Sequence, residues 1–293
     1  MTKFYFLQVR KKGKSMDVKS KEMLEQKAKD IRVDIIEMLC AAGSGHPGGS
    51  LSMADMFSYL YFSGVLNIDP KDPGKKDRDR VVLSKGHACP VLYAALAEKG
   101  YFDKKELKTL RKYGSMLQGH PDMNKTPGVD ISTGSLGQGL SCAVGMALAS
   151  KLDNSGVGVF AILGDGECDE GQIWEAAMAA RHYSLDNLIA IVDLNGLQID
   201  GFTKDVMDTA PLAEKWRSFG WKTYEIDGHD LDVIDDTMRK AISVKGSPVC
   251  IVANTTKGKG VTFMENVCDW HGNAPSEEEK DKAVYDICKI DAG

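Results

Sequence analysis

Two turns in this 293-residue chain combine residues that could bind a divalent cation and a phosphate group. The first turn places Asp165 between Gly164 and Gly166, and the second begins at Asn195, thirty positions after Asp165. Glycines let the backbone bend and leave main-chain N–H groups facing an anion, and a following helix adds the positive end of its dipole. A carboxylate, an amide oxygen and a main-chain carbonyl form the all-oxygen set that Mg²⁺ prefers. The two turns therefore predict a magnesium and diphosphate site.

The segments around these turns would place both at one edge of a sheet. Residues 157–163 form a short apolar run rich in β-formers, residues 170–183 have helical periodicity, and residues 187–194 form a second apolar run. Two strands joined by a helix lie parallel, so both turns emerge at the carboxyl edge, where open α/β sheets bind ligands. Either turn alone is typical of an ordinary loop. Their occurrence at the ends of two strands favours a shared site.

Strand and helix patterns alternate along the rest of the chain. A first amphipathic helix begins at Lys19 and ends at the glycine-rich loop before His46, and a second follows Ser52, which with Asp55 resembles a capping box. Further strands are predicted at 81–83, 222–226 and 249–253, and further helices at 90–98, 103–111, 140–152, 211–219 and 231–244. This alternation predicts the α/β class, with a doubly wound, mostly parallel sheet and helices on both faces. We assign residues 1–18 to an N-terminal extension and 19–293 to one domain.

Composition and missing motifs exclude several classes of protein. A net charge of −5 and a pI near 5.7 disfavour nucleic acid or an anionic membrane as a partner. The apolar runs are too short to span a bilayer. The seven cysteines are scattered and never form a CxxC pair, which indicates neither a disulfide framework nor a zinc site and favours a reducing cytoplasm. Walker A, Rossmann, HExxH and nucleophile-elbow sequences do not occur.

Most of the histidines lie in predicted loops. Five of the six have a glycine as neighbour: His46, His87, His120, His229 and His271. Such a histidine can present its ring to a ligand that approaches the backbone closely. Its unperturbed pKa of about 6.5 allows proton transfer near neutral pH. Taken one at a time, each is more typical of an exposed or locally hydrogen-bonded side chain.

The order of these motifs resembles that of the transketolase family. Gly-Asp-Gly followed by Asn after about thirty residues resembles the thiamine diphosphate signature. Six other segments occur in the family's order: GSGHPGGSLSMAD, LSKGHACPVLYA, QGHPD, GVDISTGSLGQGLSCAVGMALA, DGHD and WHGNAP. The resemblance runs from about Lys21 to Ala274 and covers only the family's diphosphate-binding domain. It implies the thiamine diphosphate-binding fold.

The resemblance also implies roles for individual residues. The catalytic candidates are His46, His120 and His271, near the donor sugar, and Glu170, in a carboxylate network between two active sites. The candidates for binding thiamine diphosphate are His87, Gly134, Leu136, Gly164, Asp165, Gly166, Glu167, Asn195 and His271. Mg²⁺, with Ca²⁺ or Mn²⁺ as substitutes, would bind Asp165, Asn195 and the main-chain carbonyl of Leu197.

Three assignments keep a structural alternative. Glu170 could serve only the dipole of the helix that it begins. Lys257 and Lys259 could order a loop over the diphosphate or form a solvated basic loop. His229 belongs to a DGHD turn that we interpret as structural, with Asp230 capping the next helix.

The implied activity is transfer of a two-carbon ketol unit from a ketose phosphate, of the xylulose 5-phosphate type, to an aldose phosphate. In the family, a pyrimidine-binding domain supplies the glutamate that helps to activate the cofactor, and the resemblance does not cover that domain. We therefore interpret the chain as the N-terminal subunit of a split transketolase, active with a C-terminal subunit in an α2β2 assembly. We expect the lone chain to self-associate.

Other functions remain open at this point. The chain could be a subunit of another thiamine diphosphate enzyme, such as dihydroxyacetone synthase, deoxyxylulose phosphate synthase or a 2-oxo-acid dehydrogenase. It could also be a non-catalytic, cofactor-binding partner subunit. The set of His46, His87 and His120 favours sugar hydroxyls over a lipoyl group as the substrate.

Overall fold

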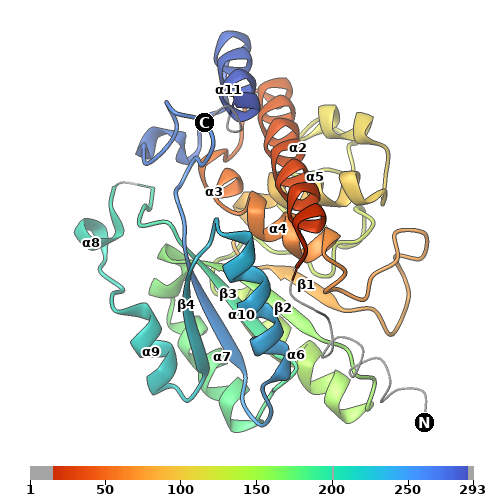
Figure 1. Ribbon diagram of the computed structural model, residues 1–293, viewed down its shortest axis with the longest axis vertical. Coiled ribbons are helices and arrows are strands. Elements are labelled where there is room, and N and C mark those ends of the chain that lie inside the picture. The colour runs from red at the N-terminus through yellow and green to blue at the C-terminus, as the bar shows by residue number, and fades with distance from the viewer. Residues whose placement is uncertain (1–15, 200, 290–293) are drawn as a thin grey trace.

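Five parallel strands form the central sheet of the computed structural model, which describes residues 16–199 and 201–289 (Figure 1). They lie in the order β1-β2-β3-β5-β4, and every neighbouring pair is parallel. Their bounds are β1 Arg80–Leu83, β2 Val159–Gly164, β3 Leu188–Leu194, β4 Lys222–Asp227 and β5 Val249–Asn254. The inner strands are almost entirely buried, which is typical of a parallel sheet covered on both faces.

Successive strand residues point to opposite faces, so the sheet separates two cores. On β2, Phe160 and Ile162 belong to the first core, whereas Ala161 and Leu163 belong to the second. The first core includes α4 Ala54–Phe62, α5 Cys89–Lys99 and α10 Leu231–Ser243, with α2 Val18–Ala42 packed on α4 and α5, and α11 Glu277–Lys289 packed on α2. The second includes α6 Gln138–Leu152, α7 Gly171–His182 and α9 Leu212–Ser218. The predicted doubly wound fold is therefore confirmed.

The first predicted helix is confirmed as α2. Asp17 accepts a hydrogen bond from the Ser20 N–H and caps its start, and Gly43 ends it in the left-handed conformation with bonds to the Leu39 and Cys40 carbonyls. Its buried side chains include the predicted Leu24, Ala28, Ile31, Ile35 and Met38. Most of the predicted extension, residues 1–15, lies outside the described residues.

Short helices occupy several loops, and two local predictions there are wrong. These helices are α3 Gly48–Leu51, α8 Thr203–Val206, η1 Gly86–Ala88, η2 Lys104–Thr109, η3 Gly166–Asp169 and η4 Cys268–His271. The segment predicted as an α-helix at 103–111 is the 3₁₀ helix η2, and Arg111, at φ 60°, turns the chain just after it. The capping box is absent because the Ser52 hydroxyl donates to Asp193 and the Asp55 carboxylate pairs with Arg32.

The chain leaves β1 and β2 toward opposite faces of the sheet. After β1 it runs into α5 in the first core, and after β2 it runs into α7 in the second core. Leu83 and Ile162 are paired near the carboxyl ends of these strands, so the two departing loops diverge beside each other. Such a divergence opens a ligand crevice in doubly wound sheets. Among the described residues, no helix is both long and apolar enough to cross a membrane.

Candidate functional site

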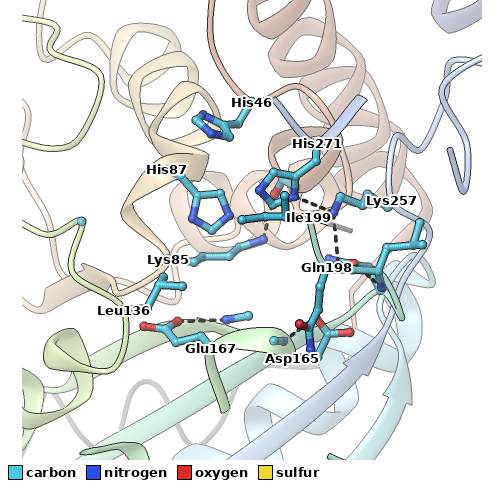
Figure 2. Close-up of a pocket in the computed structure, with 16 residues that line it drawn as sticks. His46, Lys85, His87, Leu136, Asp165, Glu167, Gln198, Ile199, Lys257 and His271 are labelled. Carbon is cyan, nitrogen blue, oxygen red and sulfur yellow. Dashed lines mark hydrogen bonds between the residues drawn. The ribbon is translucent and has the colours of Figure 1, made fainter. Parts of the chain in front are cut away.

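A cavity of about 300 Å³ lies where the carboxyl ends of β1, β2 and β3 meet (Figure 2). The loops after β1, β2, β3 and β5 contribute to its walls, together with the loop before α3 and the end of η4. Most of the predicted site residues line it: His46, His87, Gly134, Leu136, Gly164, Asp165, Gly166, Glu167, Asn195, Leu197 and His271. Two predicted residues, His120 and Glu170, are not in its lining.

Asp165 is held in the cavity wall by two main-chain groups. Its carboxylate accepts hydrogen bonds from the Gly166 N–H at 2.9 Å and the Gly196 N–H at 2.7 Å, which ties the turn after β2 to the turn after β3. The residue is 2% exposed. Burial, and then the neighbouring Asp193 carboxylate, raise the pKa of Asp165 to about 6. A cation beside this carboxylate would offset both effects, so the residue fits the predicted metal.

The amide of Asn195 has a defined orientation. Its Nδ2 donates to the Asp193 carboxylate at 2.8 Å, and its Oδ1 accepts the Leu197 N–H at 3.2 Å. An ionised carboxylate only accepts hydrogen bonds, so the nitrogen end of the amide faces it. The oxygen end of the Asn195 amide therefore faces away from the Asp193 carboxylate. Asn195 lines the cavity together with Asp165 and Leu197.

Lys257 reaches the same part of the cavity from the loop after β5. Its Nζ donates to the Leu197 carbonyl at 3.1 Å and lies 2.8 Å from His271 Nδ1. The residue is 2% exposed, and burial lowers the pKa of Lys257 to about 8. A metal on the Leu197 carbonyl would bring a second cation beside the Lys257 ammonium, and a diphosphate beside the metal would offer the amino group another acceptor.

The predicted metal ligands are oxygens of unlike chemistry. Among the described residues, no group of three histidine, cysteine or acidic side chains could hold a metal. The site would instead combine one carboxylate, one amide and one main-chain carbonyl with oxygens of the ligand and water. That donor set suits Mg²⁺, which prefers six oxygens and commonly binds phosphates in this way.

Glu167 joins the loops around the cavity. Its carboxylate accepts the Gly137 and Gly164 N–H groups, each at 3.0 Å, and the Ser84 hydroxyl. Burial raises the pKa of Glu167 above its usual value, although these donors oppose the shift. The N–H of Gly166, another predicted cofactor-binding residue, donates to Asp165. The Glu167 side chain thus fixes the shape of the crevice between β1 and β2.

Three histidine rings gather on the opposite wall, above Asp165 and Glu167 in Figure 2. The ring centroids of His46, His87 and His271 are 5.3–5.5 Å apart. Burial, followed by nearby cationic groups, lowers the pKa to about 4 for His46, about 2 for His87 and about 4 for His271. All three rings are therefore neutral at pH 7, each with one donor and one acceptor nitrogen.

Two predicted catalytic residues lie outside the cavity lining. The ring of His120 packs against Gly134, where an added Cβ would come within 3.1 Å of it, so His120 borders the cavity beside a lining residue. Burial and then Arg111 lower the pKa of His120. Glu170 is exposed at the start of α7, near Gly137, and its side chain makes no capping hydrogen bond.

The DGHD turn is structural, as predicted. His229 Nδ1 lies 2.7 Å from the Asp55 carboxylate, and His229 Nε2 accepts the Thr256 N–H at 2.9 Å. Asp230 caps α10 by accepting the N–H groups of Asp232 and Val233. This turn therefore supports the loop that carries Lys257.

A buried ion pair that was not predicted from the sequence joins Lys85, in the cavity lining, to Asp193 behind it. Lys85 Nζ lies 2.5 Å from the Asp193 carboxylate and 2.8 Å from the Gly49 carbonyl, and the two charged residues are 2% and 0% exposed. Figure 2 shows Lys85 pointing across the space beneath His87. A signal was available, because Asp193 interrupts an otherwise apolar strand and a buried charge requires a partner. Gln198 and Ile199, which also line the cavity, carried no such signal.

Comparisons with known proteins identify the family of the chain. The family described as "Transketolase, thiamine diphosphate binding domain" matches residues 23–287. A 6-deoxy-6-sulfo-D-fructose transketolase subunit from Clostridium sp. is 48% identical over 266 residues, which cover 91% of this chain and 96% of the relative. One of the subunits of an apulose-4-phosphate transketolase from Phocaeicola vulgatus is 40% identical, with 91% and 94% covered.

Solved structures show the same fold. Transketolase from Leishmania mexicana superposes with a TM-score of 0.85 at 34% sequence identity. The match covers 90% of this chain and 41% of that one, so the chain spans less than half of that protein. On the extent of the family match and of the subunit relatives, the chain belongs to the transketolase family and comprises its thiamine diphosphate binding domain.

Proposed function

We propose that the chain is the N-terminal subunit of a two-polypeptide transketolase, which binds thiamine diphosphate with Mg²⁺ and transfers a two-carbon ketol unit. The observation that carries this proposal is the cavity in which Asp165, Asn195 and the Leu197 carbonyl lie opposite three neutral histidines. The full-length match to proteins named as transketolase subunits supports a separate partner subunit. An α2β2 assembly with two-fold symmetry would give two equivalent sites.

The chain's own groups bind and orient in this proposal. When bound, thiamine diphosphate supplies the electron sink for carbon–carbon bond cleavage. The oxygens of Asp165, Asn195 and Leu197 would hold the metal, and Lys257, which lies beside the Leu197 carbonyl, would donate to a phosphate oxygen.

The neutral histidines handle protons in the same proposal. A neutral imidazole can accept a proton from a sugar hydroxyl or donate one to a developing alkoxide, and we assign this role to His46 and His271. We assign His87, whose ring centroid lies 5.3 Å from that of His46 and 5.4 Å from that of His271, to the cofactor diphosphate. His120, at the border, contacts the hydroxymethyl end of the donor.

The donor is a ketose with an anionic terminus. Candidates are xylulose 5-phosphate, together with the sulfosugar and the apulose phosphate that appear in the names of the relatives. The histidines serve the hydroxyls near the reacting carbonyl and carry no charge that would select a phosphate. We therefore assign recognition of the anionic end mainly to the partner subunit.

A transfer assay with the partner tests this function. The chain is co-purified with a polypeptide that carries a transketolase-type pyrimidine-binding domain, and ketol transfer from each candidate donor to ribose 5-phosphate is measured. We expect activity that needs both subunits and is reduced in Asn195→Ala. A complex that binds cofactor but transfers no ketol unit from any of these donors would refute the proposal and favour a non-catalytic role.

A further inference from the structure

We propose that Asp193 is a positioning residue that fixes the amide of Asn195 with its oxygen toward the metal. This inference rests on the proposed function, because it takes Asn195 as a metal ligand. It deepens that function by assigning the orientation of the ligand to a residue that does not line the cavity.

The hydrogen bonds around Asp193 define which way the amide faces. One carboxylate oxygen, Oδ2, accepts Lys85 Nζ at 2.5 Å, the Ser52 hydroxyl at 2.7 Å and Asn195 Nδ2 at 2.8 Å. The other oxygen, Oδ1, accepts the Thr255 hydroxyl. Asp193 is fully buried, so no water competes for these positions.

An asparagine ligand needs this kind of support because its two ends are unlike. The amide oxygen can bind a cation, whereas the NH₂ group is a donor only. Turned by half a rotation, Asn195 would set its oxygen against the Asp193 carboxylate and its NH₂ group toward the metal, and both contacts would be repulsive. Residues behind metal ligands commonly fix orientation in this way, and their loss costs about 10–100-fold in metal affinity.

Charge alone is the competing explanation, because Asp193 also neutralises Lys85. The two explanations separate in a pair of neutral variants of similar shape, Asp193→Asn and Asp193→Leu. In Asp193→Asn the carbonyl oxygen stays at the Oδ2 position, since Lys85 can only donate, and the new NH₂ group turns to the Thr255 hydroxyl, which can accept. Asp193→Leu removes the acceptor altogether.

The experiment is a calorimetric titration of Mg²⁺ into the full chain in the presence of thiamine diphosphate, with the melting temperature recorded for each variant. We expect Asp193→Asn to stay within about threefold of the wild type and Asp193→Leu to lose about 10–100-fold. Ser52→Ala, which removes another donor to Oδ2 and leaves Asn195 held, is the matched control and should stay within about threefold. Equal losses of Mg²⁺ affinity in Asp193→Asn and Asp193→Leu would overturn the proposal and show that Asp193 acts only through its charge.

A second background tests orientation directly. In Asn195→Asp both ends of the ligand are oxygens, so no orientation is needed. Adding Asp193→Leu in this background should then lower the Mg²⁺ affinity by less than about threefold. A loss as large as in the Asn195 background would also overturn the proposal. If Asp193→Leu does not fold, the Asn and Leu variants are compared in the Lys85→Met background, which leaves no buried ammonium unpaired.

These outcomes are distinct from those of the transfer assay. Absence of ketol transfer, with the metal affinities following the expected pattern, would refute the proposed reaction and leave the role of Asp193 intact. A wild-type chain that binds thiamine diphosphate without any dependence on Mg²⁺ would overturn the role of Asp193, whatever the transfer assay shows.

Discussion

Replacing Lys85 by Met should destabilise the chain strongly. The substitution keeps the shape of the side chain and removes the ammonium group from a pair whose members are 2% and 0% exposed. Burial alone would raise the pKa of Asp193, but Lys85 and the other donors hold it below its usual value, so the carboxylate is ionised. Without Lys85 a buried negative charge would keep only neutral donors.

The size of the loss in unfolding free energy depends on which hydrogen bonds to Asp193 remain. Removing one member of a buried ion pair typically costs about 3–5 kcal/mol. Ser52, Thr255 and Asn195 still donate to Asp193, which places the loss near the lower limit, at about 3 kcal/mol. For a chain of 293 residues, about 3 kcal/mol corresponds to a fall of roughly 5 °C in the melting temperature.

Urea unfolding and thermal melting at pH 7.5 measure this loss. Lys105→Met is the matched control, because the Lys105 side chain is 90% exposed and should change the unfolding free energy by less than about 0.5 kcal/mol. Asp193→Asn should cost less in the Lys85→Met background than in the wild type, since it then removes an unpaired charge. A loss of unfolding free energy below about 1 kcal/mol for Lys85→Met would refute the reasoning. Additive losses for Lys85→Met and Asp193→Asn in the double variant would refute it as well.

Three further predictions concern the cavity. The three cavity histidines have folded pKa values below the unfolded value of about 6.5, so the unfolded chain binds more protons below that pH. The unfolding free energy should be level above pH 7 and fall from pH 6.5 toward 4, by about 1 kcal/mol per ring at pH 5.5. Urea unfolding should show a shallower dependence of this free energy on pH in His87→Gln. Gly86→Ala should weaken cofactor binding and lower the melting temperature, because the added Cβ would lie 2.8 Å from the main chain at 133–134. Gly171→Ala is the control and should change neither, because no atom lies within 4 Å of the added Cβ. Glu170→Gln should leave the affinity of the lone chain for the cofactor unchanged within about twofold by calorimetry, because Glu170 does not line the cavity, and should reduce ketol transfer by the assembled complex. Weaker cofactor binding by the lone chain would contradict this assignment.

The sequence predicted best what parallel strands dictate. Asp165 and Asn195 follow two strands joined by a helix, and their turns are tied together by the Gly196 N–H. That proximity is a property of sheet topology, so the pattern alone could find it. The buried stripe of α2 was equally predictable, because helical periodicity decides which side chains face the core.

The errors come from contacts between distant segments. Ser52 and Asp55 looked like a local cap, but their partners are Asp193 and Arg32. The Lys85–Asp193 pair joins residues 108 positions apart, and no local pattern relates them. Glu170 lies exposed at the start of α7, and its place in a carboxylate network between two active sites stays a prediction. Tertiary partners thus decided what local propensity could not.

Cofactor binding by the full chain tests the central claim most directly. Thiamine diphosphate is titrated calorimetrically into wild type and Asn195→Ala, in Mg²⁺ and again in excess chelator. We expect binding by the wild type in Mg²⁺, loss of that binding in chelator, and at least about tenfold weaker binding by Asn195→Ala in Mg²⁺. Binding that is equally tight in chelator, or unchanged in Asn195→Ala, would contradict the assignment of this cavity as the metal and diphosphate site.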